Sequence, residues 1–153
     1  MSVVNGFNVE DPRVVETTYR VIYADTDQMG IVYHGTYLQF FERGRNAYVR
    51  SSDFTHAEID AKGYILPLVE STLRYRTPAR FDDLVSIRTL VRRVSRLKVS
   101  FEYEIFKPEN DGGEPTILVA VGTTVHGCLD KELKPARISA DWRERLLRTG
   151  ANA

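Results

Sequence analysis

The chain has 153 residues, of which 42% are hydrophobic and 27% are charged, and this balance is typical of one folded domain rather than of a disordered protein. Lys and Arg together number 21, as do Asp and Glu, so the formal net charge is zero and gives no support for a nucleic-acid partner. No apolar run approaches the length that crosses a bilayer, and no signal-peptide pattern opens the chain, so we expect no membrane insertion.

A loop separates the first predicted strand from a long helix. Residues 1–12 are polar and predict a loose N-terminal tail, so we expect a single domain over residues 13–149. Residues 14–23 are rich in β-branched and aromatic side chains, which predicts a strand. Residues 24–32 contain two aspartates and a glycine, which favour a loop.

Residues 35–50 are predicted to form the long helix, because apolar side chains recur there at helical spacing. The residues expected to share its buried face are Tyr37, Phe41, Gly44 and Tyr48, with Leu38 beside them. A glycine inside a helix costs roughly 1 kcal/mol relative to alanine, so Gly44 suggests a close approach of the helix to a sheet. A short second helix is predicted over residues 54–62, before Gly63.

Four strands and a final helix are predicted downstream. The strands are residues 66–76, 84–94, 97–106 and 117–129, with a Pro- and Gly-rich hairpin loop over residues 108–115. Residues 117–129 are apolar on both faces, which is typical of a central strand. Cys128 in that strand, the one cysteine of the chain, is interpreted as a buried thiol. A single cysteine forms no intrachain disulfide, which favours a cytoplasmic location. Ser139 is a good N-cap for the final helix, residues 139–148.

Helix and strand do not alternate along the chain, which argues against a doubly wound parallel sheet. Hairpin-length connections between the last strands favour antiparallel pairing. We therefore predict the α+β class, with an antiparallel sheet curled around one long helix.

The loop before the long helix holds the residues best suited to chemistry. Asp25, Asp27 and His34 lie where the free N–H groups of the helix point outward. Such N–H groups can hold an oxyanion, and a nearby carboxylate can attack a carbonyl or activate water. Turn or capping chemistry explains such a loop more often, and the residues alone leave both interpretations open. One histidine and two aspartates from a single loop are weak evidence for a metal site.

Residues 23–34 (YADTDQMGIVYH) strongly resemble the signature of the 4-hydroxybenzoyl-CoA thioesterase family. Tyr37, Glu42 and Arg45 resemble that family's helix, residues 74–83 (RYRTPARFDD) its strand-to-loop segment, and residues 133–135 (LKP) its close after the last strand. The resemblance covers residues 19–139. The first segment is fairly specific, and the others support it as a set.

The resemblance implies a hotdog fold, in which a five-stranded antiparallel sheet wraps around one long central helix. It also implies homodimers, often paired into homotetramers, with active sites at the subunit interface. The substrate would be an acyl-CoA thioester and water, with no cofactor and no metal. Asp27 occupies the position of the essential carboxylate, as nucleophile or general base. His34 occupies the helix start, whose backbone N–H polarises the thioester carbonyl.

Other positions of the motif carry further expectations. Gly30 and Tyr33 are expected to contact the substrate, and Tyr23 to line the acyl pocket, although a core aromatic is the default interpretation of Tyr23. Asp25 is expected to shape the loop. Tyr33-His34 resembles the residues usual at this place in the bacterial branch associated with the Tol-Pal cell-envelope system. In that branch the histidine side chain is thought to assist the reaction. The 4-hydroxybenzoyl enzymes carry an aromatic residue followed by proline there, so a 4-hydroxybenzoyl substrate is not expected.

A basic cluster surrounds the turn between two predicted strands. Its members are Arg92, Arg93, Arg96 and Lys98. One interpretation is a solvated, charged hairpin. The other is a binding site for the phosphates of CoA, because arginine binds phosphate through paired contacts. In the family this hairpin faces the CoA nucleotide, so Arg96 and Lys98 are expected to bind CoA. Lys134 is expected to join them, with Arg137 beside it.

Two alternatives to a thioesterase remain open at this stage. One is a hydratase or dehydratase of the same fold, although no motif of that kind is present. The other is a non-catalytic module that binds acyl thioesters or a partner, against which the intact Asp27 and His34 argue.

Overall fold

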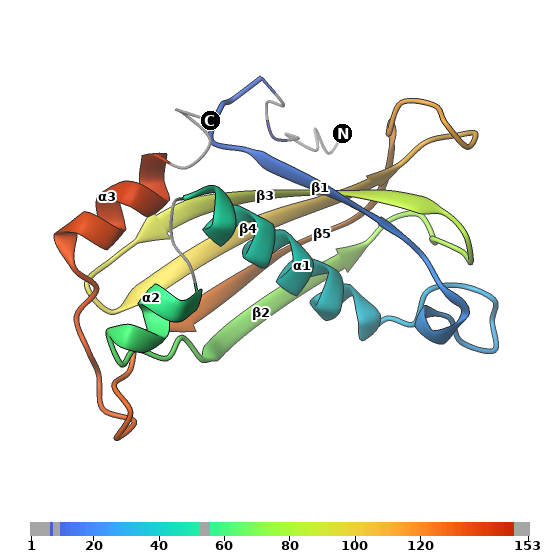
Figure 1. Ribbon diagram of the computed structural model, residues 1–153. Helices are drawn as coiled ribbons and strands as arrows, with labels where there is room; N and C mark the ends of the chain where they lie inside the picture. Colours follow the sequence, from blue (N-terminus) through green and yellow to red (C-terminus); the bar gives the residue numbers. More distant parts are fainter. Residues whose placement is uncertain (1–6, 8–9, 53–55, 149–153) are drawn as a thin grey trace.

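The computed structural model describes Phe7 and residues 10–52 and 56–148. One antiparallel sheet holds its strands in the order β1-β3-β4-β5-β2 (Figure 1). The strands are β1 (Val15–Arg20), β2 (Leu68–Tyr75), β3 (Leu84–Val94), β4 (Lys98–Lys107) and β5 (Ile117–Gly127). The helices are α1 (Thr36–Ser51), α2 (His56–Ala61) and α3 (Ala140–Arg148). The predicted α+β class and antiparallel pairing are confirmed.

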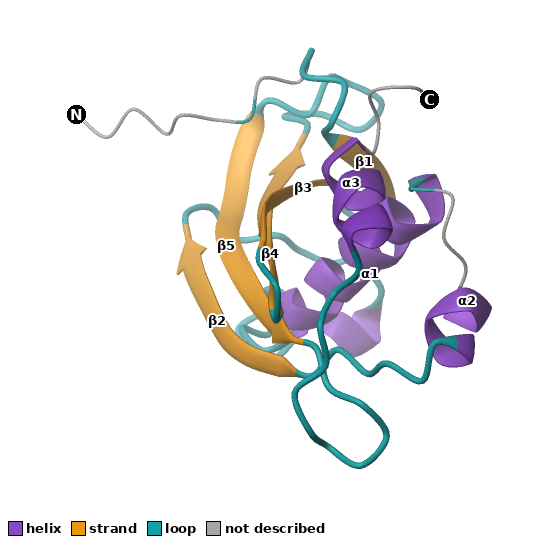
Figure 2. Cartoon of the chain, turned by 90° about the vertical axis from the view of Figure 1, so that its left-hand side faces the viewer, coloured by secondary structure: helices purple, strands orange, loops and turns teal. Residues whose placement is uncertain are grey.

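The three helices lie on one side of the sheet, and the strands curve around α1 (Figure 2). All the residues predicted to share the inner face of α1 are buried: Tyr37, Phe41, Gly44 and Tyr48. Leu38, expected beside them, is 37% exposed, so that part of the prediction is wrong. Phe40 is buried instead, because positions three and four apart share one face of a helix.

Gly44 lets α1 approach the sheet. A Cβ atom there would lie 2.3 Å from Thr89 Oγ1 and 2.9 Å from Ile87 Cγ2, both on β3. These separations are shorter than van der Waals contact, so only a hydrogen atom fits. The close approach predicted from the sequence is confirmed. One turn earlier, Phe41 stacks on Tyr103 of β4 with 4.2 Å between ring centroids.

Apolar and polar side chains alternate most clearly along β4. On β4 the apolar positions join the core: Val99, Phe101, Tyr103 and Ile105. β5 lies between β4 and β2, as expected of a central strand. Glu104, on the other face of β4, is also buried, and its carboxylate accepts the Phe7 N–H. Burial raises the pKa of this carboxyl group above its usual range.

The first strand is shorter than predicted and ends at Arg20. The chain then forms one turn of 3₁₀ helix, Tyr23–Asp25. The Asp25 carboxylate accepts the Ile22 N–H at 2.9 Å and the Tyr19 hydroxyl at 2.8 Å, and these bonds stabilise the turn. A side chain that hydrogen-bonds to a nearby backbone group competes with strand pairing in this way.

Other boundaries shift by one or two residues. α1 begins at Thr36, with Gly35 as its N-cap residue. β2 is shorter than the predicted strand over residues 66–76, and its outer side is unpaired within the described part of the chain. Residues 54–55 of the predicted second helix, residue 149 of the predicted domain and most of the predicted tail lie outside the described residues. The division into a tail and a domain over residues 13–149 stays a prediction.

β2 forms an edge of the sheet and is almost wholly exposed. Leu68, Val69 and Tyr75 are 47%, 54% and 51% exposed. An edge strand with free backbone groups and apolar side chains is a ready surface for a further strand.

The structure also bears on two expectations from the sequence, the absence of membrane insertion and the burial of Cys128. Within the described residues, no helix is long and apolar enough to cross a membrane. Cys128 is a buried free thiol, and burial raises its pKa, which disfavours the thiolate that a nucleophile requires.

Candidate active site

Asp27 opens a tight turn in the loop before α1. Its N–H donates to the Ile31 carbonyl, and the Gly30 N–H donates to the Asp27 carbonyl, each at 3.0 Å. Gly30 has φ +76°, a conformation that glycine adopts without a Cβ clash. Asp27 Oδ1 accepts the Met29 N–H at 2.8 Å. This bond orients the carboxylate, and no donor of the described residues engages Oδ2.

Asp25, the other aspartate of the motif, is held inside the loop. Its side chain binds Tyr19 and Ile22, and its carbonyl accepts the Tyr33 N–H at 2.8 Å. The residue is 7% exposed. These contacts agree with a role in loop shape and leave Asp27 as the accessible carboxylate.

Within the described residues, backbone N–H groups are free at the start of α1. The Thr36 N–H donates to the Tyr33 carbonyl at 2.9 Å, and the Leu38 N–H donates to the Gly35 carbonyl at 3.2 Å. The N–H groups of His34 and Gly35 meet no acceptor in the part of the chain that the structure describes. The N-terminal end of a helix carries partial positive charge, so these groups suit an anionic oxygen.

A pocket of about 200 Å³ brings Asp27 and His34 together. Its walls come from the Asp27 turn, the start of α1 and the end of β2. Besides Asp27 and His34, the lining includes Met29, Tyr37, Tyr75 and Arg76. A carboxylate and a helix start therefore share one pocket, which is the arrangement that carbonyl chemistry requires.

Tyr75 belongs to this pocket although the sequence assigned it no role. Its hydroxyl donates to the His34 carbonyl at 2.9 Å, and its ring meets Tyr37 edge-on. Only the fold shows that the end of β2 lies beside the start of α1.

Three other predicted substrate contacts are not part of the pocket lining in one chain. Tyr23 is 74% exposed and stacks on Phe81 with 3.8 Å between centroids. Gly30 lies at the exposed turn. Tyr33 is 47% exposed, with its ring centroid 4.2 Å from that of His34. The exposure of Tyr23 contradicts its core interpretation, and its predicted place beside the acyl group stays a prediction.

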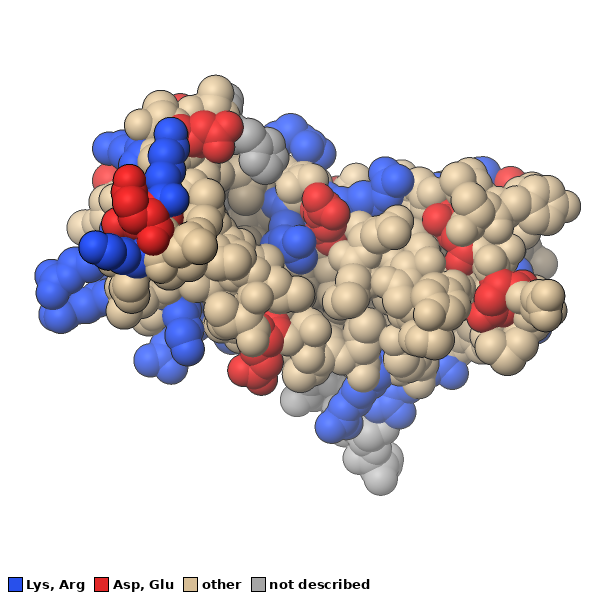
Figure 3. Space-filling view, turned by 90° about the horizontal axis from the view of Figure 1, so that it is seen from below, with Lys and Arg blue, Asp and Glu red and all other residues tan. Residues whose placement is uncertain are grey.

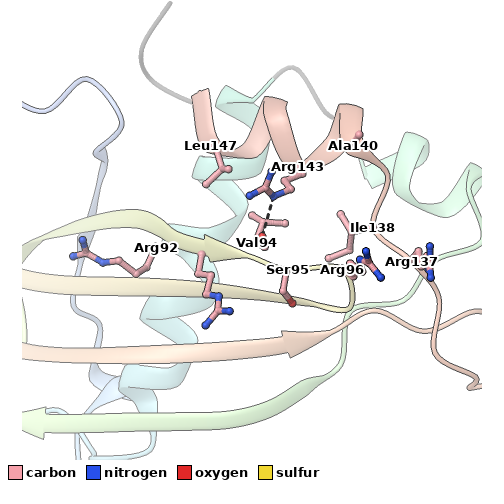
Figure 4. A pocket seen from close by; sticks show the side chains of 10 residues that line it. Arg92, Val94, Ser95, Arg96, Arg137, Ile138, Ala140, Arg143 and Leu147 are labelled. Atoms are coloured by element: carbon pink, nitrogen blue, oxygen red, sulfur yellow. Dashed lines mark hydrogen bonds between the residues drawn. The ribbon is translucent and has the colours of Figure 1, made fainter.

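A basic groove of about 680 Å³ lies between the β3–β4 turn and α3 (Figure 4). Five arginines line it: Arg92, Arg93, Arg96, Arg137 and Arg143. Lys and Arg side chains also project from this end of the molecule, at the left of Figure 3. The groove offers several guanidinium groups to one polyanion.

The five arginines of the basic groove differ in whether their side chains are already bonded. Arg92 is committed to Glu102 through two bonds of 2.8 and 2.6 Å, and Arg143 donates to the Val94 carbonyl at 3.1 Å. The side chains of Arg93, Arg96 and Arg137 make no hydrogen bond or ion pair within the described residues. Arg96 and Arg137 lie near one another in Figure 4.

The two lysines predicted to bind CoA lie outside the lining of the groove. Lys98 closes the β3–β4 turn through its backbone bonds with Ser95, and Lys134 lies in a loop held by the Asp130 carboxylate. Both side chains are exposed. Arg143 was missed because only the packing of α3 onto β3 brings it to the hairpin.

The groove and the Asp27 pocket lie at opposite ends of α1 (Figure 1). α1 has 16 residues, so it is about 24 Å long at 1.5 Å per residue. Among the described residues, no group of three or more His, Cys, Asp or Glu side chains is placed to hold a metal ion.

Comparison with known proteins shows which family this chain belongs to. The family model described as the thioesterase-like superfamily matches residues 21–146. The chain belongs to this superfamily. The match covers the Asp27 turn, α1, strands β2 to β5 and most of α3, so the thioesterase-like region includes both the pocket and the basic groove.

Two relatives show how far the similarity extends. A Bacillus subtilis protein named as a putative acyl-CoA thioesterase, YneP, is 34% identical over 80% of this chain and 87% of its own length. The acyl-CoA thioesterase YbgC of Haemophilus influenzae is 32% identical over 76% of this chain and 82% of its own.

Solved structures confirm the hotdog fold. DHNA-CoA thioesterase of Staphylococcus aureus superposes with a TM-score of 0.78 at 31% identity, covering 90% of this chain and 91% of that one. A mutant 4-hydroxybenzoyl-CoA thioesterase complexed with 4-hydroxybenzoyl-CoA gives the same TM-score of 0.78 at 18% identity, covering 88% of this chain and 99% of that one, and this likeness bears on the fold alone. Together with the named relatives, the similarity to the Staphylococcus aureus enzyme identifies this thioesterase-like protein as a thioester hydrolase.

Proposed function

We propose that the protein hydrolyses acyl-CoA thioesters to a free acid and CoA in the pocket of Asp27 and His34. One observation carries the proposal: a carboxylate with a free oxygen shares a pocket with the unpaired N–H groups of a helix start, as far as the described residues extend. The names of YneP and YbgC support an acyl-CoA substrate. Tyr33-His34 favours the Tol-Pal-associated branch, and that assignment stays a prediction.

The His34 N–H and the Asp27 carboxylate have separate roles in the proposed mechanism. The thioester oxygen accepts the His34 N–H, so charge that develops on oxygen meets a fixed donor. Asp27 Oδ2 faces the carbonyl carbon. Asp27 acts either as nucleophile, which expels the CoA thiolate and gives a mixed anhydride that water cleaves, or as general base for the attacking water. Both routes consume one water, release the carboxylic acid and the CoA thiol, and need Asp27 ionised.

An assay of the purified protein against a panel of acyl-CoAs, read out as free thiol, tests this function. We expect thiol release from at least one acyl-CoA. A hydratase or dehydratase would change the acyl chain without thiol release, and a non-catalytic module would bind the thioester intact. Either result would reject the proposal. The panel would also rank chain length and aromatic against aliphatic groups.

We propose that the basic groove and its surroundings bind the phosphates of CoA. Arg96 lies in the groove with side-chain donors that no described residue engages, and Lys98 and Lys134 are exposed near this end of the sheet. Guanidinium groups bind phosphate through paired N–H donors, and ammonium groups add point charges.

Changing Arg96, Lys98 or Lys134 singly to Ala should raise the Michaelis constant for acyl-CoA about 2- to 5-fold, the effect of one exposed charge contact. The same variants should act normally on a short pantetheine thioester, which lacks the nucleotide. The effect should shrink at high salt, because exposed charges are screened. Equal losses on both substrates would mean that these residues serve folding.

The separation of the two sites supports a homodimer. Pairing of two β2 edges across a two-fold axis is antiparallel and reverses the direction of the second chain. The basic groove of one copy then lies toward the Asp27 pocket of the other. One CoA could thus reach both sites, whereas a single chain separates them by the length of α1. A homotetramer of two such dimers stays a prediction.

Sedimentation at micromolar concentration should give a dimer or a larger assembly. Val69→Lys places a charge on the apolar β2 edge and should shift the population toward monomer. Activity on acyl-CoA should fall with the dimer population. A fully active wild-type monomer would contradict this part of the proposal.

A cytoplasmic location, which the lone thiol of Cys128 favours, also remains part of the proposal.

A further inference from the structure

Tyr75 ends β2 beside the start of α1. Its backbone pairs with Ala120 of β5, which fixes the residue to the sheet. Its ring meets Tyr37 edge-on with 5.3 Å between centroids, and its hydroxyl donates to the His34 carbonyl at 2.9 Å. Tyr75 therefore links the edge of the sheet to the loop that carries the free N–H groups.

The free N–H groups of His34 and Gly35 differ in which bonds fix their orientation. A peptide group is planar and trans, so its N–H points opposite to its carbonyl, and holding one fixes the other. The His34 N–H shares a peptide with the Tyr33 carbonyl, which the Thr36 N–H holds at 2.9 Å. The backbone alone thus fixes this first donor.

The Gly35 N–H shares a peptide with the His34 carbonyl, and here the backbone supplies no such bond within the described residues. The regular helical donor to that carbonyl would be the Leu38 N–H, which binds the Gly35 carbonyl instead. In the described part of the chain, the Tyr75 hydroxyl is the one group that holds the His34 carbonyl.

We propose that Tyr75 is a positioning residue for thioester hydrolysis, and that it aims the Gly35 N–H as a second donor to the thioester oxygen. Gly35 has helical angles, φ −71° and ψ −23°, so its N–H projects from the N-terminal end of α1. This inference rests on the proposed function. It adds a second donor beside the His34 N–H and assigns its orientation to a side chain.

Tyr75→Phe removes the hydroxyl and keeps the ring against Tyr37. We expect kcat on the best acyl-CoA to fall about 10-fold or more, because oxyanion donors act mainly in the transition state. The Michaelis constant and the melting temperature should not change. The dissociation constant for a thioether analogue of the substrate, which lacks the carbonyl oxygen, should also stay the same.

Tyr64→Phe is the matched control. Tyr64 follows α2, and α2 lies at the end of the molecule away from the start of α1 (Figure 1). The Tyr64 ring packs on Trp142. Its kinetics should equal those of the wild type. Unchanged kcat in Tyr75→Phe would overturn the inference, and so would a fall in kcat accompanied by a lower melting temperature or weaker analogue binding. A wild-type protein with no thiol release would instead reject the proposed function itself.

Discussion

Asp27→Asn is expected to lower kcat on the best acyl-CoA by about 10²–10⁴-fold, the range for loss of a group that transfers a proton or attacks. Asparagine keeps the shape of aspartate, and its oxygen can still accept the Met29 N–H that closes the turn. The variant loses the negative charge that either mechanism requires. The Michaelis constant and the unfolding transition should therefore stay near wild type. Stopped-time assays of free thiol with a fixed enzyme concentration measure the effect.

Two neighbouring variants make this result specific. Asp25→Asn should lower kcat less than Asp27→Asn, because Asp25 shapes the loop through Tyr19 and Ile22. His34→Ala should have an intermediate effect, because the backbone donor remains when the side chain is lost. Near-normal turnover by Asp27→Asn would show that the mechanism is wrong.

Gly44→Ala is expected to lower the free energy of unfolding by about 1–3 kcal/mol, the usual cost of forcing an extra group into a packed core. Its Cβ would lie 2.3 Å from Thr89 Oγ1 and 2.9 Å from Ile87. Either α1 moves away from β3 or both side chains shift. The expected sign is opposite to helix propensity, which favours alanine over glycine by roughly 1 kcal/mol.

Urea unfolding at one fixed protein concentration measures this change, because assembly would otherwise alter the apparent stability. Gln39→Ala, on the exposed side of the same helix, should change the free energy of unfolding by no more than about 0.5 kcal/mol. A free energy of unfolding of Gly44→Ala equal to or above that of the wild type would mean that β3 can move to accommodate the extra methyl group.

The elements of the fold could be read from the sequence because their patterns are local. The helical spacing of Tyr37, Phe41 and Tyr48 predicts the buried face of α1, and the alternation along β4 predicts its core side. The close approach at Gly44 also followed, since an uncompensated glycine is unfavourable in a helix. Boundaries were harder to predict, because the Asp25 side chain redirects the backbone after Arg20.

The site was only partly predictable, because its geometry depends on contacts between distant segments. The motif located Asp27 and the helix start, but the Tyr75 hydroxyl reaches His34 only through the pairing of β2 with β5. Arg92 belonged to the predicted basic cluster, yet Glu102 on the neighbouring strand binds it. The default interpretation of Tyr23 was a core aromatic, and it instead stacks on Phe81 at the surface.

In the proposed mechanism the thioester sits at the start of α1, facing Asp27, and its CoA extends to a second copy. A crystal structure of Asp27→Asn with a bound acyl-CoA would show both features at once. We expect the thioester oxygen within hydrogen-bond distance of the His34 N–H, and the CoA phosphates near Arg96 of the other chain. A thioester bound away from residue 27, or a CoA held wholly by one chain, would contradict this mechanism.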